Sequence, residues 1–337
     1  MHKETLKLKN KISKIFKNCN LSAKHSNICS DAIIYAELVG AQSHGLTRLK
    51  MYCDRIQKKL INPRPKFKIK NISNSISLLD ADNSIGFVSA DKGIDIAINK
   101  ASKTGIALVG IKNSNHYGLS KYYAEKASKK NLISLCFTNA PPAIPPHGSK
   151  KALFGTNPIC FSSPSSLNSP FTLDTSMSII NRGNIRKALK LKKKIPAGVA
   201  LDLNGKITTD PKKALEGTQL PIASHRGSGL AWMVDILCGV FTGANNAGQV
   251  KDPFEVFTAP QNVGHLFLVF KSNLFVNNFS AKIKKNIQIV KKLPKFKKTK
   301  EILYPGEKSF NTFNVNSKKK LHIPTKILKE INKLLEK

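Results

Sequence analysis

Apolar residues recur at helical spacing through the first part of the chain. Over residues 4–19 they return every three or four positions, which predicts an amphipathic helix. Ser22 is a suitable N-cap for a second helix that extends to about Gly40. A third helix is predicted over residues 46–60, and the proline-rich stretch 62–65 ends it. The N-terminal part is therefore expected to be a small helical unit.

Strand patterns dominate the middle of the chain, and helical stretches separate them. The predicted strands are residues 68–79, 106–111, 132–137 and 265–270, and the predicted helices between them are residues 91–103 and 118–130. Strands and helices that alternate in this way are typical of an α/β layer architecture. The sequence therefore predicts an α/β fold with a helical unit at its N-terminus.

The rest of the chain contains further elements with recognisable patterns. Asn204-Gly205 is a hairpin turn signal between two short strand-like stretches. Residues 229–241 are apolar on nearly every face, so they are expected to form a buried helix or a helix in an interface. Residues 272–300 are amphipathic and rich in lysine, and residues 325–337 predict a terminal helix with one apolar face.

The net charge of +36 allows a protein that binds nucleic acid or a membrane surface, but the kind of basic residue argues against it. Of the 56 basic residues only six are arginine, the usual choice for bidentate contacts with phosphates and bases. The lysines are scattered, as a compositional bias would leave them. Because this bias favours lysine, each arginine that remains is a candidate for a specific role. The arginines are Arg48, Arg55, Arg64, Arg182, Arg186 and Arg226.

Simple patterns argue against several other classes of protein. No apolar run approaches the ~20 residues that span a bilayer, and the basic N-terminus lacks the apolar stretch of a signal peptide. The six cysteines do not have the spacing of a zinc site or of a disulfide framework. We therefore expect a cytoplasmic protein with no metal, no membrane contact and no specific nucleic-acid partner.

The common nucleotide-binding and hydrolase motifs are absent. The sequence has no G-x-G-x-x-G after a strand, no P-loop, no G-x-S-x-G and no H-E-x-x-H. Residues 43–48, followed by Tyr52, are one candidate for chemistry. A histidine, Arg48 and Tyr52 near the start of a helix could clamp a carboxylate, with the last two on one helix face. The alternative is an ordinary solvated face.

Three further segments have both a chemical and a structural interpretation. His116 lies between a predicted strand and a predicted helix, where it could pass a proton to a substrate oxygen near neutral pH. The alternative is a capping loop that happens to contain a histidine. Arg226, just before the apolar helix, suits a cofactor phosphate, but the glycines beside it could serve only as a helix cap. Residues 174–176, at a strand end, likewise allow either a binding role or a purely structural one.

Nine segments, taken in order, resemble the malate/L-lactate dehydrogenase family, which is distinct from the Rossmann-fold dehydrogenases. That family includes ureidoglycolate, sulfolactate and diketogulonate oxidoreductases and a cyclic-imine reductase. The resemblance covers roughly residues 20–310. The segments are SHGLTRLKMY (43–52), GIKNSNHYG (110–118), TNAPPAIPPHG (138–148), GTNP (155–158), LDTSMS (173–178), IPAGVALDLNGKITTDPKKAL (195–215), RGSGLAWMVDILCGVFTGA (226–244), NVGHLFL (262–268) and YPGE (304–307).

The resemblance implies hydride transfer between NAD or NADP and a small 2-hydroxy acid or 2-oxo acid, such as malate, lactate or ureidoglycolate. It implies His116 as the catalytic acid/base. The substrate-binding residues that it implies are Ser43, His44, Arg48 and Tyr52. The cofactor-binding residues that it implies are Ala140, Asp174, Thr175, Ser176, Arg226, Gly306 and Glu307.

The resemblance also implies a homodimer and a mixed-sheet, non-Rossmann cofactor domain. This cofactor domain would explain why the glycine fingerprint is missing. We place a helical domain, built from the N- and C-terminal segments, at residues 1–66 plus 305–337. The α/β domain that binds cofactor and substrate is placed at residues 67–304.

Three positions near the implied cofactor site depart from the family's pattern. The stretch Ala223-Ser224-His225-Arg226-Gly227 stands where Gly-Gly-x-Lys-Gly is usual. Asn184 replaces a usual lysine, and Ala140 replaces a common serine. These departures leave the choice between NAD and NADP open. They also leave a catalytically impaired family member as an alternative to an active enzyme, beside the nucleic-acid or membrane-surface protein that the charge alone suggests.

Overall fold

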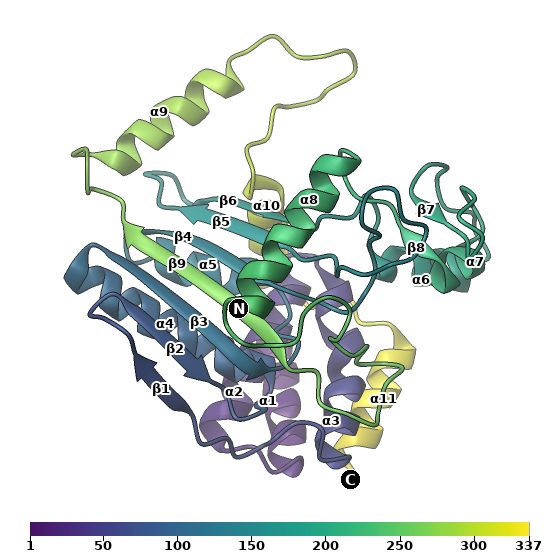
Figure 1. Ribbon diagram of the computed structural model, residues 1–337. Coiled ribbons are helices and arrows are strands. Elements are labelled where there is room, and N and C mark those ends of the chain that lie inside the picture. The colour runs from purple at the N-terminus through teal and green to yellow at the C-terminus, as the bar shows by residue number, and fades with distance from the viewer. Residues whose placement is uncertain (337) are drawn as a thin grey trace.

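The computed structural model describes residues 1–336, and its centre is a seven-stranded mixed sheet with helices around it (Figure 1). The strand order is β1-β2-β3-β9-β4-β5-β6; β2 and β3 are parallel, and all other neighbours are antiparallel. The strands of this sheet are β1 (Lys68–Asn71), β2 (Ile76–Asp80), β3 (Ile106–Ser114), β4 (Leu132–Thr138), β5 (Ile159–Ser163), β6 (Phe171–Thr175) and β9 (Val263–Lys271). The predicted α/β class is confirmed.

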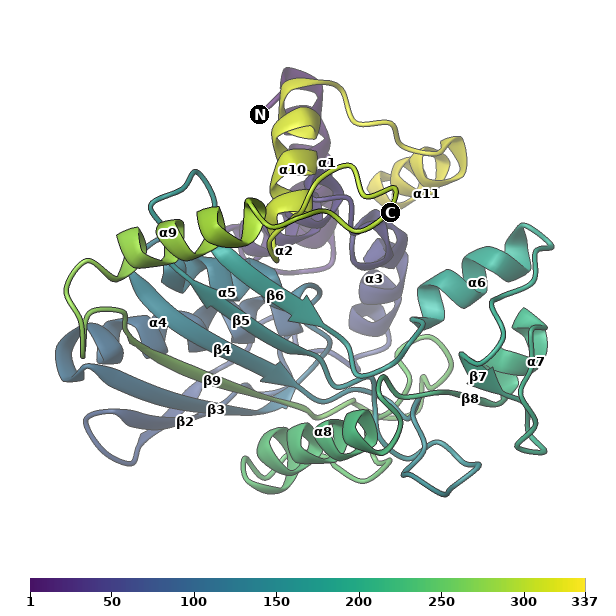
Figure 2. The same ribbon diagram turned by 90° about the horizontal axis from the view of Figure 1, so that it is seen from above.

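Helices lie on both faces of the sheet. α4 and α5 pack on one face, and α8 covers the other face near β4, as Figure 2 shows. The helices are α1 (Lys3–Asn18), α2 (Ala23–Leu38), α3 (Leu49–Gln57), α4 (Gly86–Thr104), α5 (Ser120–Ser128), α6 (Arg182–Lys190), α7 (Pro211–Glu216), α8 (His225–Asp235), α9 (Phe279–Lys291), α10 (Glu307–Lys318) and α11 (Thr325–Leu335). The short strands β7 (Ala200–Leu201) and β8 (Thr218–Gln219) form a separate ladder beside α7.

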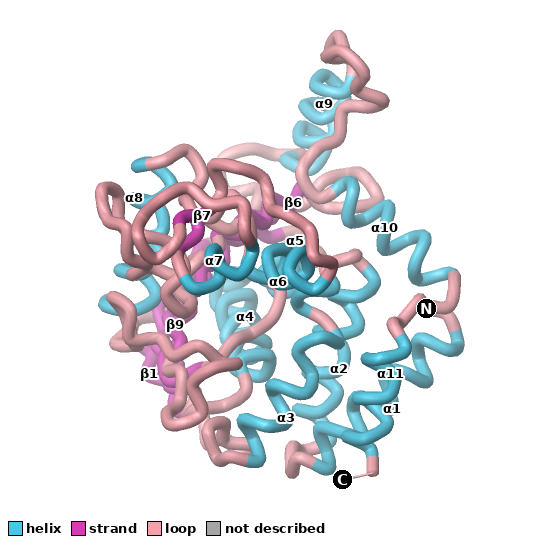
Figure 3. Tube along the Cα trace, turned by 90° about the vertical axis from the view of Figure 1, so that its right-hand side faces the viewer, coloured by secondary structure: helices cyan, strands magenta, loops and turns pink. Residues whose placement is uncertain are grey.

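Two groups of buried apolar side chains support these layers. Ile12 and Phe16 of α1 belong to a cluster that Ile331 of α11 completes, so the two ends of the chain share one core (Figure 3). A second cluster, which includes Ile94 of α4 and Phe267 of β9, fills the space between that helix and the sheet. The first cluster also includes Phe87 and Val88 of α4, so it crosses the predicted boundary at residues 66/67. The division into a helical and an α/β domain stays a prediction.

The prediction of one strand over residues 68–79 is wrong. β1 and β2 form an antiparallel hairpin, and the turn between them is closed where the N–H of Ile72 donates to the carbonyl of Ile76 at 3.0 Å. The hydroxyl of Ser73 also accepts the N–H of Ile76 at 3.1 Å. Ser73, Asn74 and Ser75 are three polar residues in a row, which is typical of a turn. The prediction of a single strand followed the alternation on either side and passed over this break.

The third predicted helix also differs from the structure. Residues 42–44 and 46–48 form two 3₁₀ turns, and α3 begins only at Leu49. Arg48 is therefore the N-cap residue of α3, and the expected helical face shared by Arg48 and Tyr52 does not form in the predicted way. Ser43, His44 and Arg48 thus lie on turns between two helices, whereas Tyr52 lies in α3.

The apolar helix predicted over residues 229–241 is only partly buried. α8 continues into a π-helical turn over Ile236–Val240. The side chains of Trp232, Val240 and Phe241 are 56–62% exposed in the single chain, so a fully buried helix is excluded and the interface alternative remains. The turn signal at 204–205 is confirmed by a 3.0 Å bond from the N–H of Gly205 to the carbonyl of Asp202.

Candidate active site

His116 lies in the loop between β3 and α5. Nδ1 of its ring is 2.7 Å from the hydroxyl oxygen of Tyr52, a fully buried residue of α3. The backbone N–H of His116 donates to the side chain of Gln261 at 3.2 Å. The ring is thus held from two sides, while its Nε2 makes no hydrogen bond within residues 1–336. Because His116 lines a cavity, this second nitrogen is available to a ligand.

Buried polar contacts fix the loop that carries His116. The side-chain amide of Asn115 donates to the carbonyl of Ser84 and to the side chain of Asn83, both at 2.9 Å. Gly86 approaches the same loop so closely that a Cβ atom there would lie 2.0 Å from the carbonyl oxygen of Asn115. Only glycine allows this contact. Asn115 was expected only as a residue flanking His116, and the sequence pattern gave no reason to select Gly86.

The two 3₁₀ turns place three predicted substrate-binding residues beside His116. Nε of Arg48 donates to the carbonyl of Ser43 at 2.7 Å, and the Ser43 hydroxyl is 2.9 Å from Nδ1 of His44. The rings of His44 and His116 stack, with their centroids 6.0 Å apart. The predicted set of Ser43, His44, Arg48 and Tyr52 is therefore brought together around His116, and their roles remain a proposal.

Glu37 of α2 supports these turns from the protein interior. Its carboxylate accepts the backbone N–H of Leu46 at 2.8 Å. A Cβ atom at Gly45 would lie 2.2 Å from a carboxylate oxygen of Glu37, so a larger residue here would have to displace that carboxylate. Burial raises the pKa of Glu37 to about 7, and the bond from Leu46 opposes that rise. Glu37 is another residue that the sequence pattern did not indicate.

Burial and nearby positive charge keep the two histidines neutral. Burial lowers the pKa of His116 well below its ordinary value, and the charge of Arg48 lowers it further. Burial also lowers the pKa of His44 to about 4, again with a smaller effect of Arg48. Burial raises the pKa of Tyr52. Near neutral pH the site therefore presents a neutral imidazole, a neutral phenol and a guanidinium cation.

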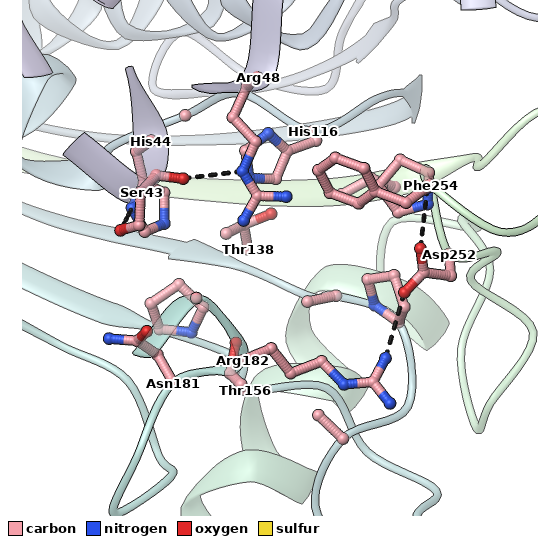
Figure 4. Close-up of a pocket in the computed structure, with 18 of the residues that line it drawn as sticks. Ser43, His44, Arg48, His116, Thr138, Thr156, Asn181, Arg182, Asp252 and Phe254 are labelled. Carbon is pink, nitrogen blue, oxygen red and sulfur yellow. Dashed lines mark hydrogen bonds and ion pairs between the residues drawn. The ribbon is translucent and has the colours of Figure 1, made fainter. Parts of the chain in front are cut away.

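The opposite side of the cavity is formed by the start of α6 and by residues 252–254 (Figure 4). Arg182 forms an ion pair with Asp252 at 3.2 Å. The ring of Phe254 contacts two guanidinium groups, with centroid distances of 4.5 Å to Arg48 and 4.9 Å to Arg186. The sequence pattern did not assign these residues to a site. The scarcity of arginine was the signal that could have found two of them.

The cavity between these two sides has a volume of about 140 Å³. That is close to the volume that holds one molecule of the size of benzene. It suits a small acid and is too small for a whole dinucleotide. The lining contains Arg48, Arg182 and Arg186 but a single carboxylate, Asp252, so its net charge is positive and favours an anionic ligand.

Most of the predicted cofactor-binding residues lie along β6, the edge strand. Asp174 and Thr175 belong to this strand, and Ser176 follows it. The carbonyl of Pro305 accepts the N–H of Thr172 at 2.9 Å, which brings Gly306 and Glu307 to the same strand. The carboxylate of Asp174 accepts the N–H of Lys121 at 3.0 Å, and burial raises its pKa to about 6.

Two contacts connect β6 with the cavity and with α8. The N–H of Met177 donates to the carbonyl of Thr156, which lines the cavity, at 2.8 Å. The carbonyl of Met177 accepts the N–H of Ile222 at 2.9 Å, just before α8. Ala140 lines the cavity itself, and its N–H donates to the side chain of Asn157 at 3.0 Å. These bonds connect the segments that carry the predicted cofactor-binding residues with the cavity, and the role of those residues remains a proposal.

The start of α8 differs from the rest of this path. Arg226 is exposed and has no ion pair within residues 1–336. Ala223 and Ser224, which stand where the family has two glycines, have φ angles of 48° and 54°. A positive φ is unfavourable for residues with a side chain. Asn184, a third departure, is exposed on α6 and does not line the cavity.

Comparison with known proteins identifies this fold and site with a class of oxidoreductases that act on hydroxy acids. The family model described as malate/L-lactate dehydrogenase matches residues 4–332. The chain therefore belongs to the malate/L-lactate dehydrogenase family. The predicted family and the predicted class, a dehydrogenase acting on a hydroxy acid, are both confirmed.

Individual relatives span nearly the whole chain. The malate/(S)-sulfolactate dehydrogenase of Methanothermus fervidus is 33% identical and covers 96% of this chain and 94% of its own length. The solved sulfolactate dehydrogenase of Methanocaldococcus jannaschii has a TM-score of 0.90 at 32% identity, over 97% of this chain and 94% of that one.

Two further relatives have a cofactor in their names. The (2R)-3-sulfolactate dehydrogenase (NADP(+)) of Chromohalobacter salexigens is 33% identical over 75% of this chain and 76% of its own. The ureidoglycolate dehydrogenase (NAD(+)) of Escherichia coli is 30% identical over 85% of this chain and 82% of its own. NAD and NADP, the two predicted cofactors, are therefore both named for relatives of this chain.

Residues 1–336 contain neither a membrane-spanning helix nor a cluster of metal-binding side chains. No helix there has the length and apolar character to cross a bilayer. No group of three or more histidine, cysteine, aspartate or glutamate side chains in this part of the chain could hold a metal ion.

Proposed function

We propose that the protein transfers a hydride between NAD or NADP and a small 2-hydroxy acid or its 2-oxo counterpart, and that His116 exchanges the hydroxyl proton. One observation carries this proposal. A neutral histidine, fixed by Tyr52, and Arg48 line the same small cavity. The two terminal nitrogens of Arg48 make no hydrogen bond within residues 1–336, so they are available to a carboxylate.

In this proposal Arg48 binds the carboxylate of the substrate in the fork geometry that a guanidinium offers. The 2-hydroxyl group then points to Nε2 of His116, which accepts its proton as the C2–H bond breaks. This role needs the tautomer in which Nδ1–H donates to the oxygen of Tyr52. The lowered pKa of His116 keeps the accepting form present in the free enzyme. In the reverse direction the protonated His116 returns the proton to the substrate oxygen.

NAD or NADP, when bound, supplies or accepts the hydride. The residues present fit an anionic dinucleotide, because Arg226 is an exposed cation in the first turn of α8, where the helix dipole also favours phosphate. We propose that Ala140, Asp174, Thr175, Ser176, Gly306 and Glu307 hold the rest of the cofactor along β6. The carboxylate of Glu307 is already paired with Lys291, so its backbone is the more available contact.

We also propose a homodimer that acts in the cytoplasm. Exposed apolar side chains on α8 and on the π-turn after it, among them Trp232, Val240 and Phe241, support the dimer, since contiguous apolar surface marks interaction sites. Sedimentation of the chain at micromolar concentration tests this. A monomer at that concentration would remove the dimer from the proposal and leave the hydride transfer unaffected.

The central experiment measures NADH and NADPH consumption with a panel of 2-oxo acids, and NAD and NADP reduction with the matching hydroxy acids. We expect turnover with at least one acid pair. NADH binding by fluorescence without turnover on any acid would instead support the catalytically impaired relative. Tight retention on heparin with a steep salt dependence would support the nucleic-acid alternative.

A further inference from the structure

Three arginines and one carboxylate determine the charge of the cavity. Arg48 lies on the side of His116, while Arg182, Arg186 and Asp252 lie on the other side. Figure 4 shows Arg48 and Arg182 on opposite sides of the cavity, with the guanidinium of Arg182 turned toward Asp252. The lowered pKa values of His44 and His116 leave both rings uncharged near neutral pH. The lining therefore holds two more positive charges than negative ones.

The single carboxylate of the lining is committed to Arg182. One oxygen of Asp252 pairs with Arg182 at 3.2 Å, and the other accepts the backbone N–H of Phe254 at 2.8 Å. Arg182 also donates to the carbonyl of Leu215 at 3.3 Å. The charge of Arg182 is therefore balanced within the protein.

Arg186 is the cation of this wall whose charge is least balanced. Its only ion pair within residues 1–336 is with Glu255 at 3.7 Å, and the side chain of Glu255 is 66% exposed. A pair of this length on the surface is largely screened by water. No hydrogen bond from the Arg186 guanidinium to the described part of the chain is present, so its donors remain available.

Phe254 holds Arg186 and Arg48 near one another. The guanidinium of Arg186 lies 4.9 Å from the centroid of this ring, and that of Arg48 lies 4.5 Å from it. The two positive charges therefore contact the same ring. Burial lowers the pKa of Arg48, and the charge of Arg186 lowers it further, which is consistent with this proximity. A guanidinium that stacks on a ring keeps the N–H groups at its edge free for a carboxylate.

We propose that Arg186 is a second anion-binding subsite, which selects 2-hydroxy acids that carry a second anionic group such as a carboxylate or a sulfonate. The inference rests on the proposed function, in which Arg48 binds the carboxylate next to the reacting carbon. A substrate with two negative charges then balances both uncompensated arginines. A substrate with one charge leaves Arg186 unpaired in a partly enclosed cavity, which is unfavourable.

The test compares malate with 2-hydroxybutyrate, which has the same number of carbon atoms but lacks the second carboxylate. Arg186→Met removes the charge and keeps a side chain of similar length. We expect kcat/KM for malate to fall about tenfold more than kcat/KM for 2-hydroxybutyrate, as the loss of one charge-assisted hydrogen bond predicts. Arg186→Lys is expected to recover part of the difference. Equal losses for both acids would contradict the subsite.

Lys187→Met provides the matched control. Lys187 is exposed, follows Arg186 on α6 and does not line the cavity. The substitution changes the net charge equally, and we expect it to leave the ratio of the two kcat/KM values unchanged. If Lys187→Met lowers the ratio as much as Arg186→Met, the effect is a general one of surface charge, and the proposed subsite is wrong.

Ligand-induced stabilisation measures the subsite without turnover. Malate is expected to raise the melting temperature of the wild-type protein more than 2-hydroxybutyrate does, and Arg186→Met is expected to abolish this difference. If malate stabilises selectively but no acid is turned over, the proposed function fails and the subsite stands. If both acids stabilise equally and are turned over equally, the subsite fails and the proposed function stands.

Discussion

The two sides of the candidate active site are built in different ways. On the substrate side, Tyr52, His116 and Arg48 are tied by hydrogen bonds of 2.7 Å to one another or to the turn that carries them. On the cofactor side, Arg226 is exposed and follows Ala223 and Ser224, two residues with positive φ angles. The first side depends on buried contacts between particular side chains. The second depends on backbone shape and on an exposed charge.

This difference accounts for where the chain departs from the family's pattern. A buried, hydrogen-bonded side chain cannot be replaced without leaving an unpaired partner, whose cost is about 1–3 kcal/mol. A contact made by backbone amides or by an exposed cation tolerates replacement at a smaller cost. None of the three departures, at Ala140, Asn184 and residues 223–226, falls on the hydrogen-bonded set of Ser43, His44, Arg48, Tyr52 and His116. We therefore expect large effects from substitutions on the substrate side and graded effects on the other.

The largest effect is expected from His116→Gln. Glutamine can retain a hydrogen bond to Tyr52 but cannot act as a base, so kcat should fall by at least about a hundredfold. Steady-state kinetics with the best acid of the panel measures this loss. The affinity for NADH, measured by fluorescence, should stay within about twofold of wild type because His116 lies on the substrate side. Turnover close to that of the wild type would remove His116 from the mechanism.

Arg48→Met is expected to have the next largest effect. It removes the cation that we propose for the substrate carboxylate, so kcat/KM should fall about a hundredfold through loss of a bidentate ionic contact. It also removes the 2.7 Å bond to the carbonyl of Ser43. Thermal unfolding of the variant must therefore be measured beside the kinetics. A KM for the acid that does not change would show that Arg48 does not bind the carboxylate.

Glu37 supports the substrate side and makes its stability depend on pH. Its pKa is about 7 in the folded protein and ordinarily 4.5, so the protonated form is favoured by folding. This stability is fully present below pH 4.5 and is lost as pH rises through 7. Glu37→Gln lacks the titration, so the variant should gain up to about 3 kcal/mol relative to wild type between these limits.

Urea unfolding of both proteins at several pH values measures this difference. The other titrating groups, including His44 and His116, are the same in both proteins and cancel in the comparison. A difference in unfolding free energy that stays constant from pH 4.5 to 8 would show that Glu37 is already ionised in the folded state at low pH.

Local patterns predict much of the fold because many helices and strands begin and end at local signals. Ser22 caps α2 as expected, its hydroxyl accepting the N–H of His25 at 3.2 Å. The order of the strands cannot be read from such signals. β9 lies between β3 and β4 although it follows β4 by more than a hundred residues, and this pairing depends on tertiary packing. The turn after Ile72 has a local signal, the polar run Ser73-Asn74-Ser75, which the prediction of one continuous strand passed over.

The same limit separates the two walls of the cavity. His116 and Arg48 lie next to the ends of regular elements, where a sequence pattern points to them. Arg182 and Asp252 are 70 residues apart, and only the packing of the start of α6 against the loop of residues 252–254 brings them together. Composition was the remaining signal, since Arg48, Arg182 and Arg186 are half of the six arginines in a chain rich in lysine. The composition indicates that these arginines are functionally important, but it does not show which residues lie together in the fold.

On the cofactor side, Arg226→Ala is expected to weaken NADH binding by about three- to tenfold, the value of an exposed charge at a helix N-terminus. Arg226→Lys should bind nearly as well as wild type, because it keeps the charge. Fluorescence titration at low ionic strength measures both variants. Arg64→Ala, which removes an exposed arginine that is bonded to Asn20, is the control for net charge. Unchanged binding by Arg226→Ala would place the phosphates elsewhere.

The smallest effect is expected from Ser224→Gly, which restores the family's residue at a strained position. Ser224 has φ 54° and ψ −123°, a conformation open mainly to glycine. Relief of this strain should exceed the entropy that glycine adds to the unfolded chain, so the free energy of unfolding should rise by about 1 kcal/mol. Urea unfolding measures the change, and Ser224→Ala is the matched control because it keeps the Cβ atom and hence the strain. If the alanine variant is stabilised as much as the glycine variant, the effect comes from loss of the hydroxyl, and the cofactor side is not strained at this residue.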